Sequence, residues 1–467
     1  MKKALATILA LVMALALCSV SWAANPASVS NAEELKTAIG AATAENNTIT
    51  LTENIDLSES VTINKSGVNL VIDLGGKKIS GSSQLFDIYS PVTFKNGTID
   101  VTYNGSASIC VMWLNGGAKL ALENDVIVNA AKSAGATGSV FAVGFWSDCD
   151  RAELTINGKI TGDNGATING TITTNTNKVN GTIDVAGHAL YLAGNGITDI
   201  NNGACVKGDA GIEIRAGVLN INGGTVESTG TYSVPSANGN GTTASGAALI
   251  VAEHTTNQGI TVNVNSGNIK AASAGKAIAV SDPQSTGGND VKLNVAGGNV
   301  VGGIQVEESI ETAKPVAVTG GTFSSDVSAY TADNTPVAFT FNEGTSNNRT
   351  YYVGAGTIQN VANNLSAGQQ LWIVKGTVTL MGVPAGVTVY PEHDTVVSVN
   401  GKDISNEFDG YTVPQSSGYY YYQPTTDTKT TDTKGSPKTF DAGIALYVGM
   451  ALTSAAGVAF VGKKRED

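Results

Sequence analysis

The chain is short of charged residues, aromatic residues, proline and cysteine, and these shortages exclude several classes of protein. Charged residues make up 14% and aromatic residues 6% of its 467 residues, and the net charge of −12 disfavours binding to nucleic-acid phosphates. The 11 prolines and the lack of a Gly-X-Y period exclude collagen. Beyond residue 24 the cysteines are Cys110, Cys149 and Cys205, a sparse and odd set that argues against a disulfide framework. We expect them to be buried free thiols.

Glycine and apolar residues are abundant instead. Glycine occurs 56 times in 467 residues, well above its usual share of ~7%. Hydrophobic residues make up 42% of the chain, too many for a protein that is disordered throughout. This composition predicts many short strands joined by turns of Gly and Asn.

The first residues read as a signal peptide over 1–23. Lys2 and Lys3 precede an apolar run, and Ser21-Trp22-Ala23 offers a small-x-small cleavage site. We therefore expect export of the chain and a mature protein that starts at Ala24.

A second apolar segment stands near the C-terminus. Residues 442–462 carry no charge and are followed by the basic tail 463–467, which begins Lys463-Lys464-Arg465. About 20 apolar residues span a bilayer as a helix, and a basic flank stays on the cytoplasmic side. The pattern predicts a transmembrane helix over 442–462, with a buried core helix as the alternative.

The segment before this span resembles a Gram-positive sortase sorting signal, whose pattern is Leu-Pro-x-Thr-Gly. Pro437, Lys438 and Thr439 match the pattern, whereas Ser436 and Phe440 depart from it. The resemblance implies a sortase as partner and wall linkage at Thr439, or retention in the membrane if Phe440 prevents cleavage. Both outcomes place the body on the cell surface of a Gram-positive-type bacterium. Residues 423–441, rich in Thr, Asp and Lys, are expected to be a solvated linker.

The middle of the chain, residues 47–327, repeats one pattern of short apolar alternation, Gly or Asn-Gly, and a β-branched residue. The turn glycines recur at multiples of about 21–23 residues, for example at 158, 181, 203 and 224, and such a period indicates a solenoid. A leucine-rich solenoid lacks its Leu pattern here, and β-sandwiches need longer strands. The period predicts an all-β parallel β-helix with two or three short strands per coil.

The alternation also predicts which side chains are buried. Successive residues of a strand face opposite sides, so Ile212 and Ile214 are expected inside and Glu213 and Arg215 in solvent. Asn side chains at equivalent corners are expected to hydrogen-bond from coil to coil.

Three segments carry a more specific resemblance. Ile55-Asp56-Leu57, Val61-Thr62-Ile63 and the run from Val71 to Ser80 resemble the opening of pectin-lyase-like proteins. The later Gly-Gly-Thr coils resemble surface β-helix proteins of Gram-positive bacteria. The resemblance implies a right-handed parallel β-helix.

Flanking elements complete the predicted architecture. Within 24–46, Ser30-x-x-Glu33 predicts a capping box and a short helix that covers the open end of the first coil. Residues 328–422 are expected to form a smaller β-rich unit with a short helix over 358–365.

Candidate catalytic residues are few. Enzymes of the pectin-lyase-like fold carry clustered Asp residues with Gly-His-Gly, or calcium-binding Asp residues with an Arg base, and Gly187-His188-Ala189 is only a fragment of the first. The best patch is 145–151, in which Asp148 and Asp150 could bind Ca²⁺ and Arg151 could act as base or clamp. Trp146 could stack on a sugar ring. The alternative is a surface turn with an internal salt bridge, and no other cofactor or metal is expected.

Other candidate residues concern binding. Tyr419 and Tyr420 begin a run of four tyrosines that could bind glycans or form a last strand. His188, His254 and His393 lie far apart in the chain, so no metal site is expected from them. Glu253-His254 and Glu392-His393-Asp394 are expected to be solvated turns.

These features together predict a non-enzymatic surface protein, an adhesin or a structural or glycan-interaction protein. The alternative is an extracellular polysaccharide lyase or glycoside hydrolase. The expected partners are a glycan or cell-surface ligand, a sortase and the membrane through 442–462, but not nucleic acid.

Overall fold

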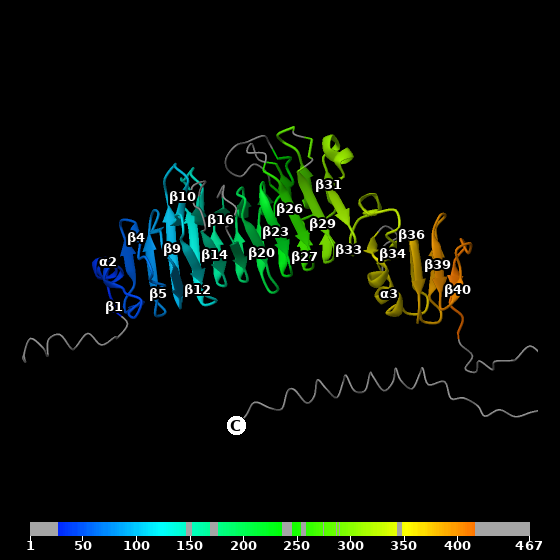
Figure 1. The fold of residues 1–467 in the computed structure, drawn as a ribbon, viewed down its shortest axis with the longest axis horizontal. Helices are drawn as coiled ribbons and strands as arrows, with labels where there is room; N and C mark the ends of the chain where they lie inside the picture. Colours follow the sequence, from blue (N-terminus) through cyan, green and yellow to red (C-terminus); the bar gives the residue numbers. More distant parts are fainter. Residues whose placement is uncertain are drawn as a thin grey trace, which may run out of the picture. The chain divides into compact units, whose positions relative to one another are not determined.

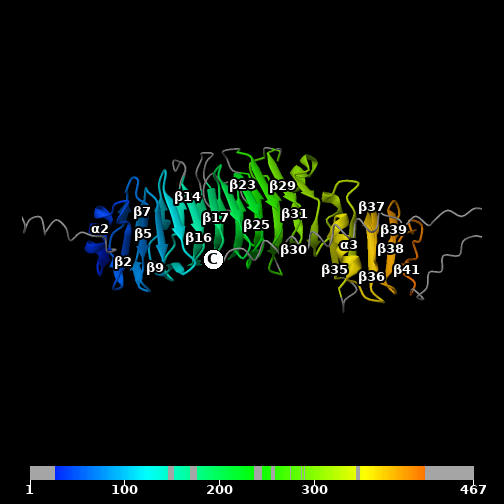
Figure 2. The ribbon, with the colours of Figure 1, turned by 60° about the horizontal axis from the view of Figure 1, so that its bottom comes forward.

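The computed structural model of the chain describes residues 27–145, 152–168, 176–235, 245–253, 258–273, 275–285, 287–288, 290–342 and 348–415. Strands dominate this part of the chain, and most of them belong to three long sheets. Figures 1 and 2 show the strands lying side by side, each coil of chain adding a strand to each sheet.

Twelve strands form the first sheet, and all pair in parallel. In spatial order they are β1 (Ala27–Val29), β2 (Thr48–Leu51), β5 (Leu70–Asp73), β8 (Val92–Lys95), β11 (Lys119–Leu122), β14 (Glu153–Ile156), β17 (Thr176–Val179), β20 (Ile197–Ile200), β23 (Gly217–Ile221), β26 (Ile260–Val264), β29 (Val291–Val295) and β32 (Val316–Val318).

Ten strands form the second sheet, also parallel. They are β4 (Val61–Ile63), β7 (Phe86–Ile88), β10 (Ile109–Leu114), β13 (Val140–Phe145), β16 (Asn164–Ile168), β19 (His188–Leu192), β22 (Ala210–Ile214), β25 (Ala247–Ala252), β28 (Lys276–Ser281) and β31 (Ile304–Val306).

The third sheet has sixteen strands, of which the first eleven are parallel. These are β3 (Ile55–Leu57), β6 (Lys78–Gly81), β9 (Gly97–Tyr103), β12 (Val126–Lys132), β15 (Lys159–Gly162), β18 (Thr182–Val185), β21 (Cys205–Gly208), β24 (Thr225–Ser228), β27 (Asn268–Lys270), β30 (Asn299–Val301) and β33 (Gly321–Phe323). The sheet continues through β35 (Arg349–Val353), β34 (Val337–Phe341), β36 (Gln370–Lys375), β38 (Thr388–Pro391) and β41 (Tyr411–Thr412).

The strand registers confirm the period found in the sequence. Ile160 of β15 pairs with Ile183 of β18, which pairs with Val206 of β21. Each coil therefore contributes one strand to each of three sheets, and the middle of the chain is a solenoid of parallel strands, as predicted. Apolar side chains of successive coils stack inside it; Ile49, Ile72 and Phe94 are each at most 1% exposed.

Asparagine ladders link neighbouring coils on the outside, as predicted. Asn180 Nδ2 donates to Asn157 Oδ1, and Asn201 Nδ2 donates to Asn180 Oδ1, both at 2.7 Å. A second ladder runs along the twelve-stranded sheet through Asp199, Asn220, Asn263 and Asn294. In both ladders, each side-chain amide donates a hydrogen bond to the residue at the equivalent position of the preceding coil. These bonds satisfy the polar side chains and keep neighbouring coils in register.

The turn glycines have two different causes, close approach between coils at some turns and a positive φ at others. A Cβ atom on Gly181 would overlap the backbone carbonyl oxygens of Asn157 and Gly158 in the preceding coil. At Gly181 a larger residue would force the coils apart, whereas Gly203 has open space around its Cβ position and a φ of +87°, a conformation that favours glycine.

The first helix, α2 (Ala32–Ala41), differs from prediction at its start. Its N-cap is Asn31, whose side chain accepts from Glu34 N at 3.0 Å, while Ser30 N donates to the Glu34 carboxylate at 2.7 Å. The capping residue and its acidic partner each lie one position after the predicted Ser30 and Glu33. Leu35 belongs to the same buried core as the first coils. Figure 1 shows α2 beside the first strands of the solenoid.

Beyond the solenoid, the chain forms the expected smaller β-rich unit with a helix. The helix α3 (Ala355–Asn363) begins three residues before the predicted 358–365, directly after Gly354, whose φ is +89°. A separate sheet of β37 (Thr377–Leu380), β39 (Val396–Val399) and β40 (Lys402–Asp403) completes it. The unit has its own apolar core, but the sixteen-stranded sheet joins it to the solenoid, and residues up to Gln415 form one compact unit.

Within the described residues, no helix has both the length and the apolar character needed to cross a membrane. The predicted signal peptide 1–23, linker 423–441, transmembrane helix 442–462 and tail 463–467 lie outside the described residues.

Candidate functional site

Most of the predicted site residues lie outside the described part of the chain. These are Trp146, Asp148, Asp150, Arg151, His254, Tyr419, Tyr420, Pro437, Lys438 and Thr439. Phe145, which precedes the patch, ends β13 and is fully buried. No geometry is therefore assigned to the catalytic, calcium or tyrosine candidates.

The prediction that Glu213 and Arg215 face solvent is wrong. Both side chains lie on the outer face of the ten-stranded sheet, yet both are 0% exposed. Tyr191, Glu213, Ile250 and Ala279 stand opposite one another on four neighbouring strands of this face. Ile250 and Ala279 belong to a small apolar cluster outside the main core. Strand alternation placed the residues on the correct face, but that face is covered in these coils.

In this covered layer, the carboxylate of Glu213 lies next to the side chains of His188 and Arg215. His188 Nε2 lies 3.0 Å from Glu213 Oε2, although the two atoms lack hydrogen-bond geometry, and Arg215 Nη1 lies 3.4 Å from Glu213 Oε1. Arg215 Nε also donates to the backbone carbonyl of Glu253 at 3.2 Å. The side chains of His188, Glu213 and Arg215 therefore lie together in one buried cluster rather than on a solvated surface.

A tyrosine completes this layer. Burial, with the nearby Glu213 carboxylate, raises the pKa of Tyr191 above its usual range. Within the described part of the chain, its hydroxyl has no hydrogen-bond partner. These four side chains could in principle exchange protons with a substrate, but all of them are buried. We therefore interpret the cluster as one that stabilises the packing of neighbouring coils.

Of the two predicted solvated turns, the structure contradicts one and confirms the other. Glu253 is only 3% exposed, which contradicts the expected solvated turn, because its carbonyl is held by Arg215. Glu392, His393 and Asp394 do form an exposed turn, as predicted. Among the described residues, no group of three His, Cys, Asp or Glu side chains could hold a metal ion.

The cysteine prediction is confirmed in part. Cys110 is buried and free, and burial raises the pKa of its thiol to about 12. Cys205 is free but only half-buried, since it lies on the outer face of the solenoid, and Cys149 lies outside the described residues.

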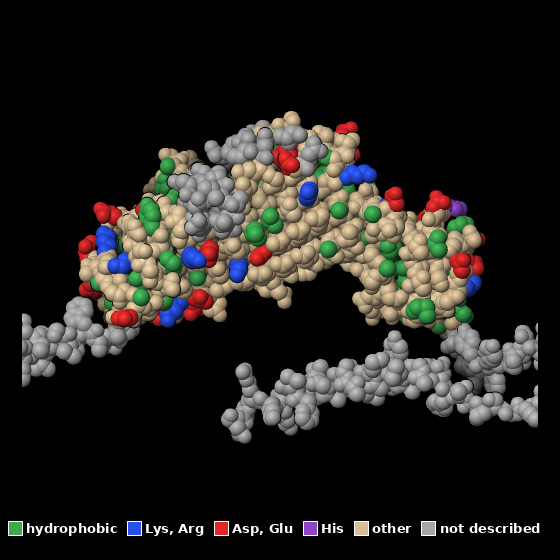
Figure 3. Space-filling model, in the orientation of Figure 1, with side chains coloured by type: hydrophobic (Ala, Val, Ile, Leu, Met, Phe, Trp, Pro, Cys, Tyr) green, Lys and Arg blue, Asp and Glu red, His purple; other side chains and the backbone are tan. Residues whose placement is uncertain are grey.

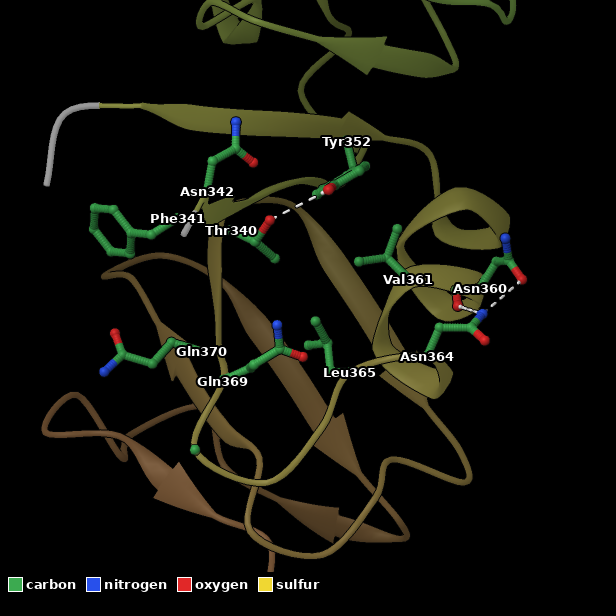
Figure 4. Close-up of a pocket in the computed structure, with 11 residues that line it drawn as sticks. Thr340, Phe341, Asn342, Tyr352, Asn360, Val361, Asn364, Leu365, Gln369 and Gln370 are labelled. Carbon is green, nitrogen blue, oxygen red and sulfur yellow. Dashed lines mark hydrogen bonds between the residues drawn. The ribbon is translucent and has the colours of Figure 1, made fainter. Parts of the chain in front are cut away.

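A pocket of about 810 Å³ opens in the C-terminal unit (Figure 4). Strands β34 and β35 supply Thr340 and Tyr352, and α3 and the segment after it supply the opposite wall. Val361 and Leu365 give an apolar patch within it. The polar lining consists of carboxamides, namely Asn342, Asn360, Asn364, Gln369 and Gln370.

Hydrogen bonds fix part of this lining and leave other groups available. Thr340 Oγ1 and Tyr352 Oη lie 3.2 Å apart. Asn364 Nδ2 donates to the Asn360 carbonyl at 2.7 Å, and Gln369 Oε1 accepts from Ser366 N at 2.6 Å. The NH₂ group of Gln369 makes no hydrogen bond to the described residues, so it can donate to a ligand.

The described lining of the pocket is uncharged. No described residue that lines it is acidic or basic. Arg349 of β35 does not line the pocket; its guanidinium lies 4.3 Å from the Phe339 ring centre and 5.5 Å from that of Phe341, which does. Carboxamides and hydroxyls both donate and accept hydrogen bonds, and with an apolar patch they suit a neutral ligand rich in hydroxyl groups.

An aromatic stack lies beside Arg349. Trp372 stacks on Tyr390 at 4.1 Å between ring centres and on Phe339 at 5.8 Å. Arg349 covers one end, and Gly410 packs against Tyr390 at the other. Because the ring faces cover each other, this stack stabilises the sheet and offers little surface for a sugar.

Sequence reasoning missed the pocket, although a signal was present. The segment from Gln359 to Gln370 contains six carboxamide side chains in twelve residues. Comparison of the chain with known family models, curated proteins and solved structures finds no match.

Proposed function

We propose that this protein is a non-enzymatic cell-surface protein that binds neutral glycans through the pocket of its C-terminal unit. The observation that carries the proposal is a large pocket lined by carboxamides, hydroxyls and three apolar side chains, Phe341, Val361 and Leu365, without a charge among the described residues. Glycan hydroxyls need paired donors and acceptors, and a carboxamide supplies both.

The electrostatics of the molecule support a neutral ligand. In the face shown in Figure 3, charged side chains of both signs are scattered among neutral ones, without a basic patch that would attract nucleic acid or acidic polysaccharide. The chain is acidic overall, so an anionic ligand would be repelled. A neutral sugar avoids this cost.

The burial of the acid–base side chains supports binding rather than catalysis. A lyase or hydrolase needs an acid or base within reach of its substrate. Glu213 and Arg215 are 0% exposed, and His188 is nearly so. The alternative function, a polysaccharide lyase or hydrolase, would therefore depend on Asp148, Asp150 and Arg151, which lie outside the described residues.

The finer architecture is part of the same proposal. We infer that the coils are right-handed, that α2 caps the first coil, and that residues 442–462 anchor the chain in the membrane or guide it to the wall through Pro437, Lys438 and Thr439. This C-terminal anchor would then hold the C-terminal unit, and the solenoid that precedes it in the chain, outside the cell.

Glycan binding tests the proposal. The purified protein is applied to an array of neutral and acidic glycans, and hits are measured by calorimetry. Asn364→Ala and Gln369→Ala should each weaken binding about 5- to 30-fold, since a hydrogen bond is worth ~1–2 kcal/mol. Asn294→Ala, which removes an exposed carboxamide from the solenoid, is the matched control and should bind normally.

An activity assay separates the alternative. The protein is incubated with pectin and related uronates, with and without calcium. Unsaturated ends or new reducing sugars would overturn the non-enzymatic proposal, and binding confined to acidic glycans would overturn the neutral ligand.

A further inference from the structure

The dipeptide Asn-Gly recurs at the corners of the solenoid, but its surroundings differ from one corner to the next. In such a pair the backbone nitrogen of Gly can attack the side-chain carbonyl carbon of Asn, because Gly has no Cβ atom and its backbone is flexible. The attack forms a cyclic succinimide and releases ammonia, and water then opens the ring to aspartate or isoaspartate. The reaction therefore needs an Asn side chain that can rotate and a Gly N–H that no hydrogen bond holds.

At the corners of the asparagine ladder both groups are held. Asn180 Nδ2 donates to Asn157 Oδ1, and Asn180 Oδ1 accepts from Asn201 Nδ2, each at 2.7 Å. Gly181 N donates to the Ile156 carbonyl at 2.9 Å. These bonds must break before Gly181 N can reach the Asn180 side chain, so the stacked coils oppose the reaction.

The pair Asn202-Gly203, in the next coil, lacks these bonds. Both residues are exposed, in a turn closed by a bond of 3.1 Å from Ala204 N to the Asn201 carbonyl. Neither the Asn202 side chain nor Gly203 N has a hydrogen-bond partner among the described residues. The Asn202 side chain is therefore able to turn towards the Gly203 nitrogen.

The pair Asn104-Gly105, directly after β9, is open in the same way. Asn104 is exposed, and within the described chain its side chain and Gly105 N are both without a hydrogen-bond partner. The Gly105 carbonyl accepts from Thr137 N and Gly138 N at 3.2 Å. The segment is thus fixed through this carbonyl, while the two reacting groups stay available.

We propose that Asn104 and Asn202 deamidate spontaneously in the folded protein, whereas the asparagine ladder protects Asn180. The ladder then has a second role, because it prevents a corner amide from reacting with its own backbone. Each reaction replaces a neutral carboxamide by a carboxylate and adds one negative charge. Isoaspartate also adds one atom to the backbone at Asn202, where a Cβ atom on Gly223 of the next coil would lie only 2.7 Å from the Asn202 Cα.

Peptide mass spectrometry tests the proposal on the full chain, incubated at pH 8 and sampled over weeks. In the folded protein, Asn104 and Asn202 should each react at least about tenfold faster than Asn180, because the hydrogen bonds of Asn180 must open first. In guanidinium chloride the ladder is lost, and the rates at Asn180 and Asn202 should agree within about twofold.

Two variants that each remove one ladder bond test the protection itself. Asn201→Ala removes the donor to Asn180 Oδ1. It should raise the rate at Asn180 about fivefold, which is the effect of one typical hydrogen bond. Asn294→Ala removes one donor from the other ladder and is the matched control, so the rate at Asn180 should not change. Circular dichroism verifies that both variants fold.

Each outcome decides part of the proposal. Equal rates at Asn180 and Asn202 in the folded protein, or no reaction at Asn104 and Asn202, would overturn the assignment of these sites. An unchanged rate at Asn180 in the folded Asn201→Ala variant would overturn the protective role of the ladder. Glycan binding in the pocket of the C-terminal unit is independent of these results.

Discussion

The carboxylate of Glu213 lies 3.0 Å from His188 Nε2 and 3.4 Å from Arg215 Nη1, on the outer face of a sheet where solvent is excluded. His188 and Glu213 come from neighbouring strands, β19 and β22, so the contact joins consecutive coils. The outer layer of these coils thus has a buried ionic network as well as backbone ladders.

Removal of the Glu213 charge should destabilise the protein strongly. Glu213→Gln leaves the Arg215 guanidinium buried with one fewer compensating charge, and breaking a buried pair in this way costs ~3–5 kcal/mol. Glu227→Gln is the control, since Glu227 makes longer contacts with Lys207 and Lys270 at the surface and its loss should cost under ~1 kcal/mol. Urea unfolding measures both. Equal losses would show that Glu213 does not neutralise Arg215.

The solenoid could be predicted from the sequence because its signals are local and repeated. Asn and Gly, as at Asn180 and Gly181, occur at equivalent corner positions of several coils. The alternation in β22 places Ile212 and Ile214 in the core. Because the same sequence pattern recurs in each coil, an ambiguous strand or turn in one coil can be assigned from the equivalent residues of the next.

The burial of Glu213 and the pocket could not be predicted in the same way. Whether the outer face of the ten-stranded sheet is exposed depends on chain segments distant in sequence. The alternation of apolar residues within a strand gives no information about those segments. The pocket joins Thr340 and Tyr352 from two strands with Asn364 and Gln369 from a later segment. The sequence showed the carboxamides but not that β34 and β35 reverse to face them.

The asparagine ladder should contribute to stability according to the number of bonds that each residue makes. Asn263 donates to Asn220 at 2.9 Å and accepts from Asn294 at 3.0 Å. Asn263→Ala removes both bonds and should cost ~1–2 kcal/mol, whereas Asn294→Ala removes one and should cost about half as much. Urea unfolding curves give the two values. A larger loss for Asn294→Ala would contradict the ladder interpretation.

Glycines at corners and in the helix should respond in opposite directions to alanine. Gly181→Ala places a methyl group against the carbonyl of Gly158, which forces the backbone to shift and should lower the melting temperature. Gly40 lies in α2 with open space around its Cβ position. Gly40→Ala should therefore stabilise the protein by ~0.5–1 kcal/mol. Differential scanning calorimetry of the two variants decides, and a stabilised Gly181→Ala variant would refute corner packing.

The Cys110 thiol should make stability depend on pH in the alkaline range. Burial raises its pKa from the ordinary value of 9.0 to about 12 in the folded state. The folded protein therefore holds the thiol proton more tightly than the unfolded chain, and the associated stability is complete below pH ~9 and declines as the pH rises towards 12. Unfolding in urea at several alkaline pH values should show this decline, and Cys110→Ala should reduce it.

Iodoacetamide at pH 8 should label Cys205 before Cys110, because the thiolate is the reactive form and Cys205 is only half-buried. Mass spectrometry locates the label, and faster labelling of Cys110 in folded protein would contradict its burial.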